Sequence, residues 1–213
     1  MIEYLKYFIM VYGGLFAITN PVGAVPVFLS VTHNLSWKER HEIARKTALV
    51  VVITLTLFAL LGEWIFRFFG SSVNAFAIAG GILLFKMAME MLSGKVSTVK
   101  ISSEETEELG EEVVTLEEVA ITPLAIPLIS GPGAITTVML YMGNSHGVPE
   151  KAVVMAGVLA IGLTVWLVLW SSRGIQMRLG RTGIKVLTRM MGLILTSMAV
   201  QMVINGIKGA FGL

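Results

Sequence analysis

Six long stretches without lysine, arginine, aspartate or glutamate determine what this 213-residue chain can fold into. They cover residues 7–32, 47–62, 68–85, 119–149, 152–172 and 190–207. A membrane-spanning helix needs about 20 apolar residues. The mean hydropathy is +0.80, and charged residues make up 14% of the chain, against about 25% in soluble domains. The sequence therefore predicts an all-α integral membrane protein with six transmembrane helices.

We expect these spans near residues 4–31, 43–66, 73–92, 118–141, 151–172 and 184–207. Ser36, followed three residues later by Glu39, is typical of a helix cap before the second span. A glutamate-rich segment separates two halves of similar length. The predicted organisation is a first three-helix repeat (1–94), an acidic cytoplasmic loop (95–117) and a second three-helix repeat (118–213).

Lysine and arginine are concentrated in the loops after the first, third and fifth spans. Cytoplasmic loops carry the excess of these residues in membrane proteins. We therefore expect those loops in the cytoplasm and both termini outside the cytoplasmic membrane.

Two spans contain sequences that a continuous helix does not tolerate. The first contains Asn20–Gly23 (Asn-Pro-Val-Gly), and the fourth contains Ser130–Gly133 (Ser-Gly-Pro-Gly). Proline removes a backbone donor, and glycine costs about 1 kcal/mol relative to alanine in a helix. Irregular backbone at membrane depth survives only where protein buries it or where it lines a cavity. Helices 1 and 4 are therefore predicted to be discontinuous.

The two halves of the chain resemble each other at a fixed offset of 111 positions. Residues 81–92 align with 192–203, and the same offset places residues 18–21 on 129–132. With three spans in each copy, the second copy must enter the membrane inverted. Inverted repeats with broken helices in corresponding positions are typical of secondary transporters, whose substrates bind at the repeat interface.

A broken helix presents free carbonyls at one half-helix end and free N–H groups at the other. No charged side chain adjoins either break, so the pair suits a small zwitterion such as a neutral amino acid. The sequence leaves open which break binds the carboxylate. Side-chain contacts between helices are the alternative role for the polar residues of the breaks. The predicted substrate-binding residues are Thr19, Asn20, Pro21, Gly23, Ala24, Ser130, Gly131, Pro132, Gly133, Ala134 and Thr136.

Ionisable residues within spans are functional candidates, so we consider Glu63, Lys86 and Glu90 for coupling or gating. A structural pair is the alternative for Lys86 and Glu90, which are four residues apart, and a side chain reaching towards water is the alternative for Glu63. The three histidines are expected in loops, and neither a metal site nor a cofactor is expected.

Residues 19–26 and 123–137 resemble the two signature stretches of the MarC/SnatA family, and the similarity extends over essentially the whole chain. The resemblance implies transport of glycine and alanine, driven by a proton gradient or, alternatively, by sodium. It also implies the two breaks as the binding region. The expected partners are the amino acid and the lipid bilayer, without nucleic acid, and the oligomeric state stays open.

Three other functions compete with this interpretation. An exporter of drugs or other metabolites would favour a roomy pocket with an acidic residue, which neither break offers. A channel would form its pore by oligomerising around an axis. An enzyme is not expected, because the chain contains neither a His-Glu-x-x-His nor a Gly-x-Ser-x-Gly motif.

Overall fold

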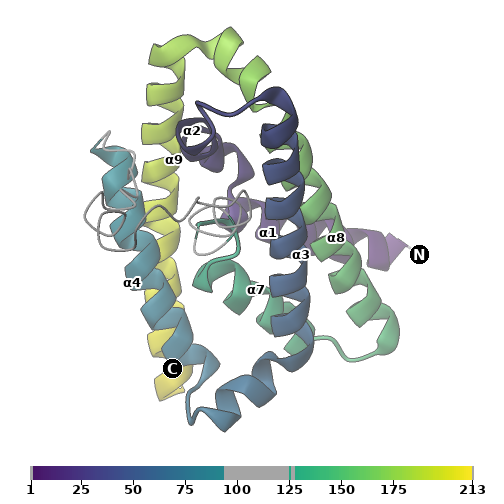
Figure 1. Cartoon of the computed structure of the whole chain (residues 1–213). Helices are drawn as coiled ribbons and strands as arrows, with labels where there is room; N and C mark the ends of the chain where they lie inside the picture. The colour runs from purple at the N-terminus through teal and green to yellow at the C-terminus, as the bar shows by residue number, and fades with distance from the viewer. Residues whose placement is uncertain (1, 94–124, 126–127, 213) are drawn as a thin grey trace, which may run out of the picture.

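The computed structural model describes residues 2–93, 125 and 128–212, and every regular element within them is helical (Figure 1). Before the gap the elements are α1 (Ile2–Thr19), α2 (Pro21–Val31), α3 (Trp37–Phe68) and α4 (Val73–Leu92). After it follow α7 (Pro132–Gly143), α8 (Val148–Trp170) and α9 (Ser172–Phe211).

Five helical stretches of the described chain are long and apolar enough to cross a membrane, and the first of them joins α1 to α2 across residue 20. The chain is therefore a helical, multi-pass membrane protein. For the predicted span at 118–141, the structure describes mainly the second part, which is α7. Most of its first part and the whole acidic loop (95–117) lie outside the described residues.

Among the helices that begin before their predicted starts, α3 and α9 differ most from the prediction. α3 begins at Trp37 because Ser36 and Glu39 form the expected capping box, with the Ser36 N–H donating to Glu39 Oε2 at 2.7 Å. His41 therefore lies inside α3, so its predicted place in a loop was wrong. α9 begins at Ser172, and Gly180 kinks it with a φ of 62°.

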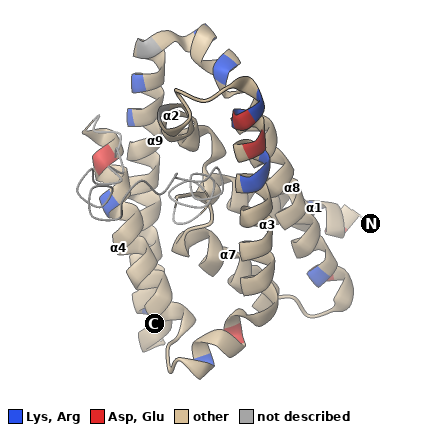
Figure 2. Cartoon of the chain, viewed as in Figure 1, with Lys and Arg blue, Asp and Glu red and all other residues tan. Residues whose placement is uncertain are grey.

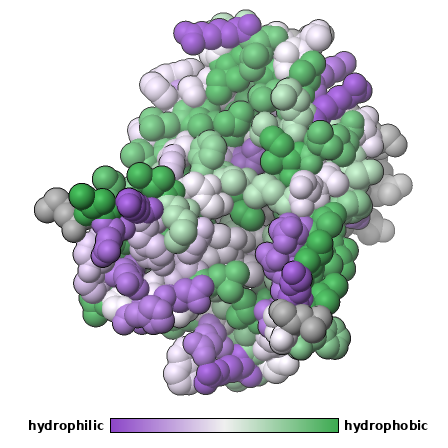
Figure 3. Space-filling model, turned by 180° about the vertical axis from the view of Figure 1, so that it is seen from behind, coloured by the Kyte–Doolittle hydropathy of each residue, from purple (hydrophilic) through white to green (hydrophobic). Residues whose placement is uncertain are grey.

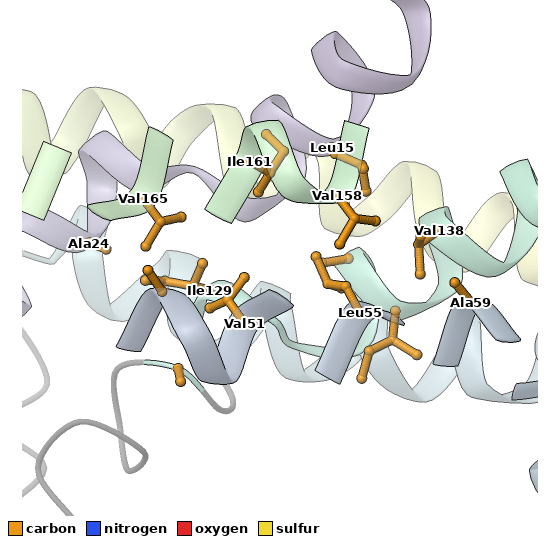
Figure 4. Close-up of a cluster of buried hydrophobic side chains, with 14 of the residues drawn as sticks. Leu15, Ala24, Val51, Leu55, Ala59, Ile129, Val138, Val158, Ile161 and Val165 are labelled. Atoms are coloured by element: carbon orange, nitrogen blue, oxygen red, sulfur yellow. The ribbon is translucent and has the colours of Figure 1, made fainter. Parts of the chain in front are cut away.

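The largest core cluster lies where α3 faces α8 (Figure 4). Val51 and Leu55 of α3 point towards Val158 and Ile161 of α8, all fully buried. At the edge of this interface, a β-carbon on Gly157 of α8 would lie only 2.7 Å from a methyl of Val11 in α1. Small residues let membrane helices approach closely, which is how these three helices pack.

A second interface joins α4 and α9, which lie side by side and antiparallel (Figure 1). A β-carbon on Gly81 of α4 would lie 2.8 Å from the Ala199 carbonyl oxygen of α9. One on Gly192 of α9 would lie 3.0 Å from the Ala88 carbonyl oxygen of α4. Gly81 and Gly192 are 111 residues apart, and so are Ala88 and Ala199. The two contacts therefore join corresponding positions of the two halves.

Charged residues lie mostly towards the two ends of the upright helices, and most of the middle contains none (Figure 2). Apolar side chains cover much of the surface in the opposite view (Figure 3). Many are large and exposed, such as Leu60 at 60%, Trp64 at 74% and Leu193 at 65%. Such a surface is stable in contact with lipid and not in water.

Candidate functional site

Asn20 produces the first helix break. Its backbone has φ 42° and ψ 60°, a left-handed conformation that asparagine tolerates better than most residues. Its N–H closes the last turn of α1 on the Phe16 carbonyl at 3.0 Å, and Pro21 then begins α2 without needing a donor partner. The Asn20 side-chain oxygen accepts from the Gly23 N–H at 3.1 Å. Asn20 therefore ends one helix and caps the next.

A small cavity adjoins this break. Its volume is about 10 Å³, enough for about one water molecule. None of the described residues around it is charged. It is lined by Ile18, Thr19, Asn20, Gly23, Ala24, Leu84, Met87, Met91, Leu128 and Leu195. The predicted uncharged surroundings of the first break are thus present, and α4 and α9 complete them.

The second break is built differently. The N–H and the hydroxyl of Ser130 both donate to the Ala125 carbonyl at 2.8 Å, which closes a wide turn before the break. Gly131 then precedes α7 with extended backbone, and no described side chain caps the helix. The Thr136 hydroxyl donates to the Pro132 carbonyl at 2.7 Å. The Ser130 and Thr136 hydroxyls are thus engaged locally, whereas the start of α7 has no side-chain cap.

The two breaks meet in the interior. A β-carbon on Gly133, in the first turn of α7, would lie 3.0 Å from Ile18 Cγ2 and 3.1 Å from Met202 Sδ. Ile18 also lines the cavity at the first break. Thr19, Ser130 and Ala134 are at most 1% exposed, so protein buries both breaks. Non-helical backbone inside a membrane requires such burial.

The glycines of the breaks make room for protein atoms. A β-carbon on Gly23 would lie 2.7 Å from Asn20 Cγ, so this glycine leaves space for the capping side chain. Gly133 leaves space for Ile18 and Met202, as described above. A β-carbon on Gly80 of α4 would likewise collide with Pro132, so this glycine leaves space for the start of α7.

A second cavity, of about 40 Å³, adjoins the first. Both are lined by Gly23, Met87, Met91 and Leu128, so these residues form the wall between them. The second cavity also reaches Glu90 and Thr188. Met87 and Met91 were not among the predicted site residues, although their spacing of four places both on one face of α4.

The three candidate coupling residues occupy different environments. Glu63 is exposed and forms an ion pair with Arg67 at 2.6 Å, with both side chains at least 70% exposed. Such exposed ion pairs contribute little to the stability of the fold. Lys86 is also exposed, whereas Glu90 is half-buried and lines the second cavity. Only Glu90 among the three lies close to the first break.

Comparison with known proteins places the chain in a family. Residues 5–211 match the family model described as MarC family integral membrane protein. A UPF0056 membrane protein of Pyrococcus horikoshii is 62% identical over the full length of both chains. A similarly named protein of Methanocaldococcus jannaschii is 46% identical, covering 97% of this chain and 98% of its own. The protein YvbG of Bacillus subtilis is 38% identical, covering 97% and 96%. No solved structure gives a significant match.

Proposed function

Because the chain belongs to the MarC family of integral membrane proteins, we propose that it is a secondary transporter for small neutral amino acids. It carries glycine and alanine across the cytoplasmic membrane by alternating access, and it is neither an enzyme nor dependent on a cofactor. The observation that carries this proposal is the meeting of two buried helix breaks beside an uncharged cavity.

The state of each half-helix end suggests how a zwitterion binds. The Gly23 N–H at the start of α2 already donates to the Asn20 side chain. The start of α7 has no cap among the described side chains. Free N–H groups and the positive end of the helix dipole favour an anion. We therefore assign the substrate carboxylate to the Gly133–Ala134 N–H groups and the ammonium to carbonyls at the end of α1, near Ile18 and Thr19.

The size of the cavities supports a small substrate and a closed state. A volume of about 10 Å³ at the first break leaves no room for an amino acid. Binding therefore requires the wall formed by Gly23, Met87, Met91 and Leu128 to move. Methionine side chains rearrange easily because they are unbranched. The competing function, export of drugs or other metabolites, would need a far larger movement.

The α4–α9 interface supports the inverted repeat. The Gly81–Ala199 and Gly192–Ala88 contacts are those that a two-fold axis would interchange, because both partners shift by 111 residues. We therefore propose six spans arranged as two inverted three-helix repeats, with both termini outside. The ends of α3 and α9 that carry Arg40 and Arg173 then face the cytoplasm.

Coupling to a proton gradient is assigned to Glu90. A carboxyl group that lines a cavity next to the substrate can exchange a proton as the wall moves. Glu63 fits this role poorly, because it is exposed and paired with Arg67. Sodium is the alternative coupling ion.

The test is uptake of labelled glycine into liposomes that contain the purified protein. An imposed pH gradient should drive accumulation, excess unlabelled alanine should compete, and a sodium gradient serves as the second condition. Absence of counterflow for every small neutral amino acid would contradict the proposal.

Gly133→Val should abolish glycine transport, because the added side chain meets Ile18 and Met202 where the breaks come together. Gly143→Val, at the other end of α7, is the matched control, since no atom lies within 4 Å of a β-carbon there. The same liposome assay measures both variants, and membrane insertion is checked by yield. Normal transport by Gly133→Val would show that the closeness of the breaks is not needed.

A further inference from the structure

A polar cavity of about 540 Å³ lies away from the helix breaks, between the turn that joins α2 to α3 and the first turns of α9. Arg40 and Arg173 both line it, together with His33, Ser36 and Gln176. Leu29 and Trp37 contribute apolar surface. The proposed transport function uses none of these residues.

Arg40 is held in place by two hydrogen bonds. Its Nε donates to the Thr32 carbonyl at 2.9 Å, and its Nη2 donates to the His33 carbonyl at 2.8 Å. A guanidinium has five N–H groups, so further donors are available to a ligand. Arg173 belongs to the first turn of α9 and is exposed. The nearby carboxylate of Glu39 already accepts from the Ser36 N–H at 2.7 Å and does not line the cavity.

Aromatic side chains place this end of the bundle at a membrane surface. Trp37, at the start of α3, is 63% exposed, and its ring centroid lies 3.9 Å from that of His41. The His41 ring in turn contacts Trp170 at the end of α8, with 5.7 Å between centroids. Exposed tryptophans mark the level of lipid headgroups. The two arginines of the cavity therefore lie at that level.

The first part of α9 supports the same placement. Residues 172–179 precede the kink at Gly180 and cross the upper end of the bundle (Figure 1). This segment exposes Met177 at 74% and Leu179 at 45%, alongside Arg173 and Arg178. Exposed apolar and basic side chains on one short helix are typical of a segment lying in the plane of a membrane surface.

From these observations we propose that the cavity binds the phosphodiester of an anionic lipid headgroup. Arg173 and the fixed guanidinium of Arg40 contact the phosphate oxygens, and Gln176 supplies a further donor. Guanidinium groups match phosphate geometry and bond it through charge-assisted hydrogen bonds. The acyl chains pass along the exposed Trp37 into the bilayer.

The test titrates purified protein in detergent with phosphatidylglycerol, phosphatidylcholine or inorganic phosphate. Native mass spectrometry measures the bound lipid, and thermal unfolding measures the shift in midpoint. We expect retention of phosphatidylglycerol over phosphatidylcholine and little effect of inorganic phosphate. Arg173→Gln should weaken phosphatidylglycerol binding at least about tenfold, the effect of losing one charge-assisted hydrogen bond. Lys38→Gln removes an exposed charge that does not line the cavity, and it should bind normally.

Gln176→Glu provides an independent variant that places a negative charge in the lining, and it should weaken binding in the same way. The unfolding midpoint without lipid shows whether each variant is folded. Equal binding of the two lipids would overturn the proposal, as would wild-type affinity in Gln176→Glu. Inorganic phosphate that stabilises the protein and displaces phosphatidylglycerol would identify a soluble phosphate ligand and overturn the lipid assignment.

Discussion

At the scale of single residues, Asn20 explains how a membrane helix is interrupted, because it ends α1 and caps α2. It combines a left-handed backbone with a side chain that caps the following helix. A glycine would tolerate the backbone and lose the cap, whereas an alanine would lose both advantages. Gly23 is the partner that this arrangement requires, because a larger residue would displace the Asn20 amide.

Asn20→Ala should therefore lower the stability of the protein more than Asn20→Gly. Loss of a cap costs about 1 kcal/mol, and the left-handed backbone of a residue with a β-carbon adds about 1–2 kcal/mol. The thermal unfolding midpoint of each variant in detergent measures the difference. Equal midpoints would show that the left-handed backbone at position 20 does not destabilise the alanine variant.

Met91 illustrates a residue whose role depends on its neighbours. It is 6% exposed and belongs to the wall between the two cavities. Truncating it should join them and widen the space beside the first break.

Met91→Ala should accordingly admit larger neutral amino acids. The measurement is competition of unlabelled leucine against labelled glycine in liposomes, with leucine competing better in the variant than in the wild type. Leu193→Ala is the control, because this α9 side chain is 65% exposed and lines neither cavity. An unchanged preference in Met91→Ala would show that the wall does not determine substrate size.

At the scale of elements, the helix ends show local sequence rules acting inside a membrane protein. Ser36 caps α3 and Ser72 caps α4, each through its hydroxyl and the N–H three residues later. The capping box extends α3 outward to Trp37, past the end of its apolar run. The kink at Gly180 separates the first eight residues of α9 from its membrane span, which the hydropathy of the chain places at 182–211.

Ser36→Ala should destabilise the protein by about 1 kcal/mol, because it removes the acceptor for the Glu39 N–H. Ser71→Ala is the matched control, since Ser71 is exposed and precedes the cap of α4 without acting as one. Chemical denaturation in detergent compares the two. A loss of similar size in both variants would contradict a specific role for the capping box.

At the scale of the whole molecule, the interface between α4 and α9 joins residues that the offset of 111 positions relates. Equivalent glycines in the two halves contact equivalent alanines of the opposite half. Helix approach of this kind depends on the absence of a β-carbon, and it fixes the distance between two long helices. The two breaks, the two small cavities beside the first break, and helices α2 and α7 all lie beside this pair.

Gly81→Ala and Gly192→Ala should therefore destabilise the protein by similar amounts, about 1–3 kcal/mol for an overpacked interface. Gly174→Ala on α9 is the control, because no atom lies within 4 Å of a β-carbon there. Unfolding midpoints of the three variants provide the comparison. Tolerance of one interface variant together with strong destabilisation by the other would contradict the two-fold relation.

Some features of this protein follow from the sequence alone. Apolar length determines which segments enter the membrane, and proline with glycine determines where the first span breaks. Hydropathy and backbone preference are local properties, so a single sequence contains them. The capping box of α3 was predicted for the same reason. The position of His41 was predicted wrongly, because the capping box extends α3 beyond the apolar run that marked its expected start.

Tertiary structure alone decided what surrounds the breaks. In the folded chain, Ile18 lies next to Gly133, and Met87 and Met91 form part of the wall between the two small cavities. Glu90 lies beside that wall, whereas Glu63 is exposed. These relations join residues that are distant in sequence, and they depend on how whole helices pack. Asn20–Gly23 and Ser130–Gly133 are visible in the sequence as two breaks related by an offset of 111 positions, and only the packing of the helices shows that both are buried and lie close together.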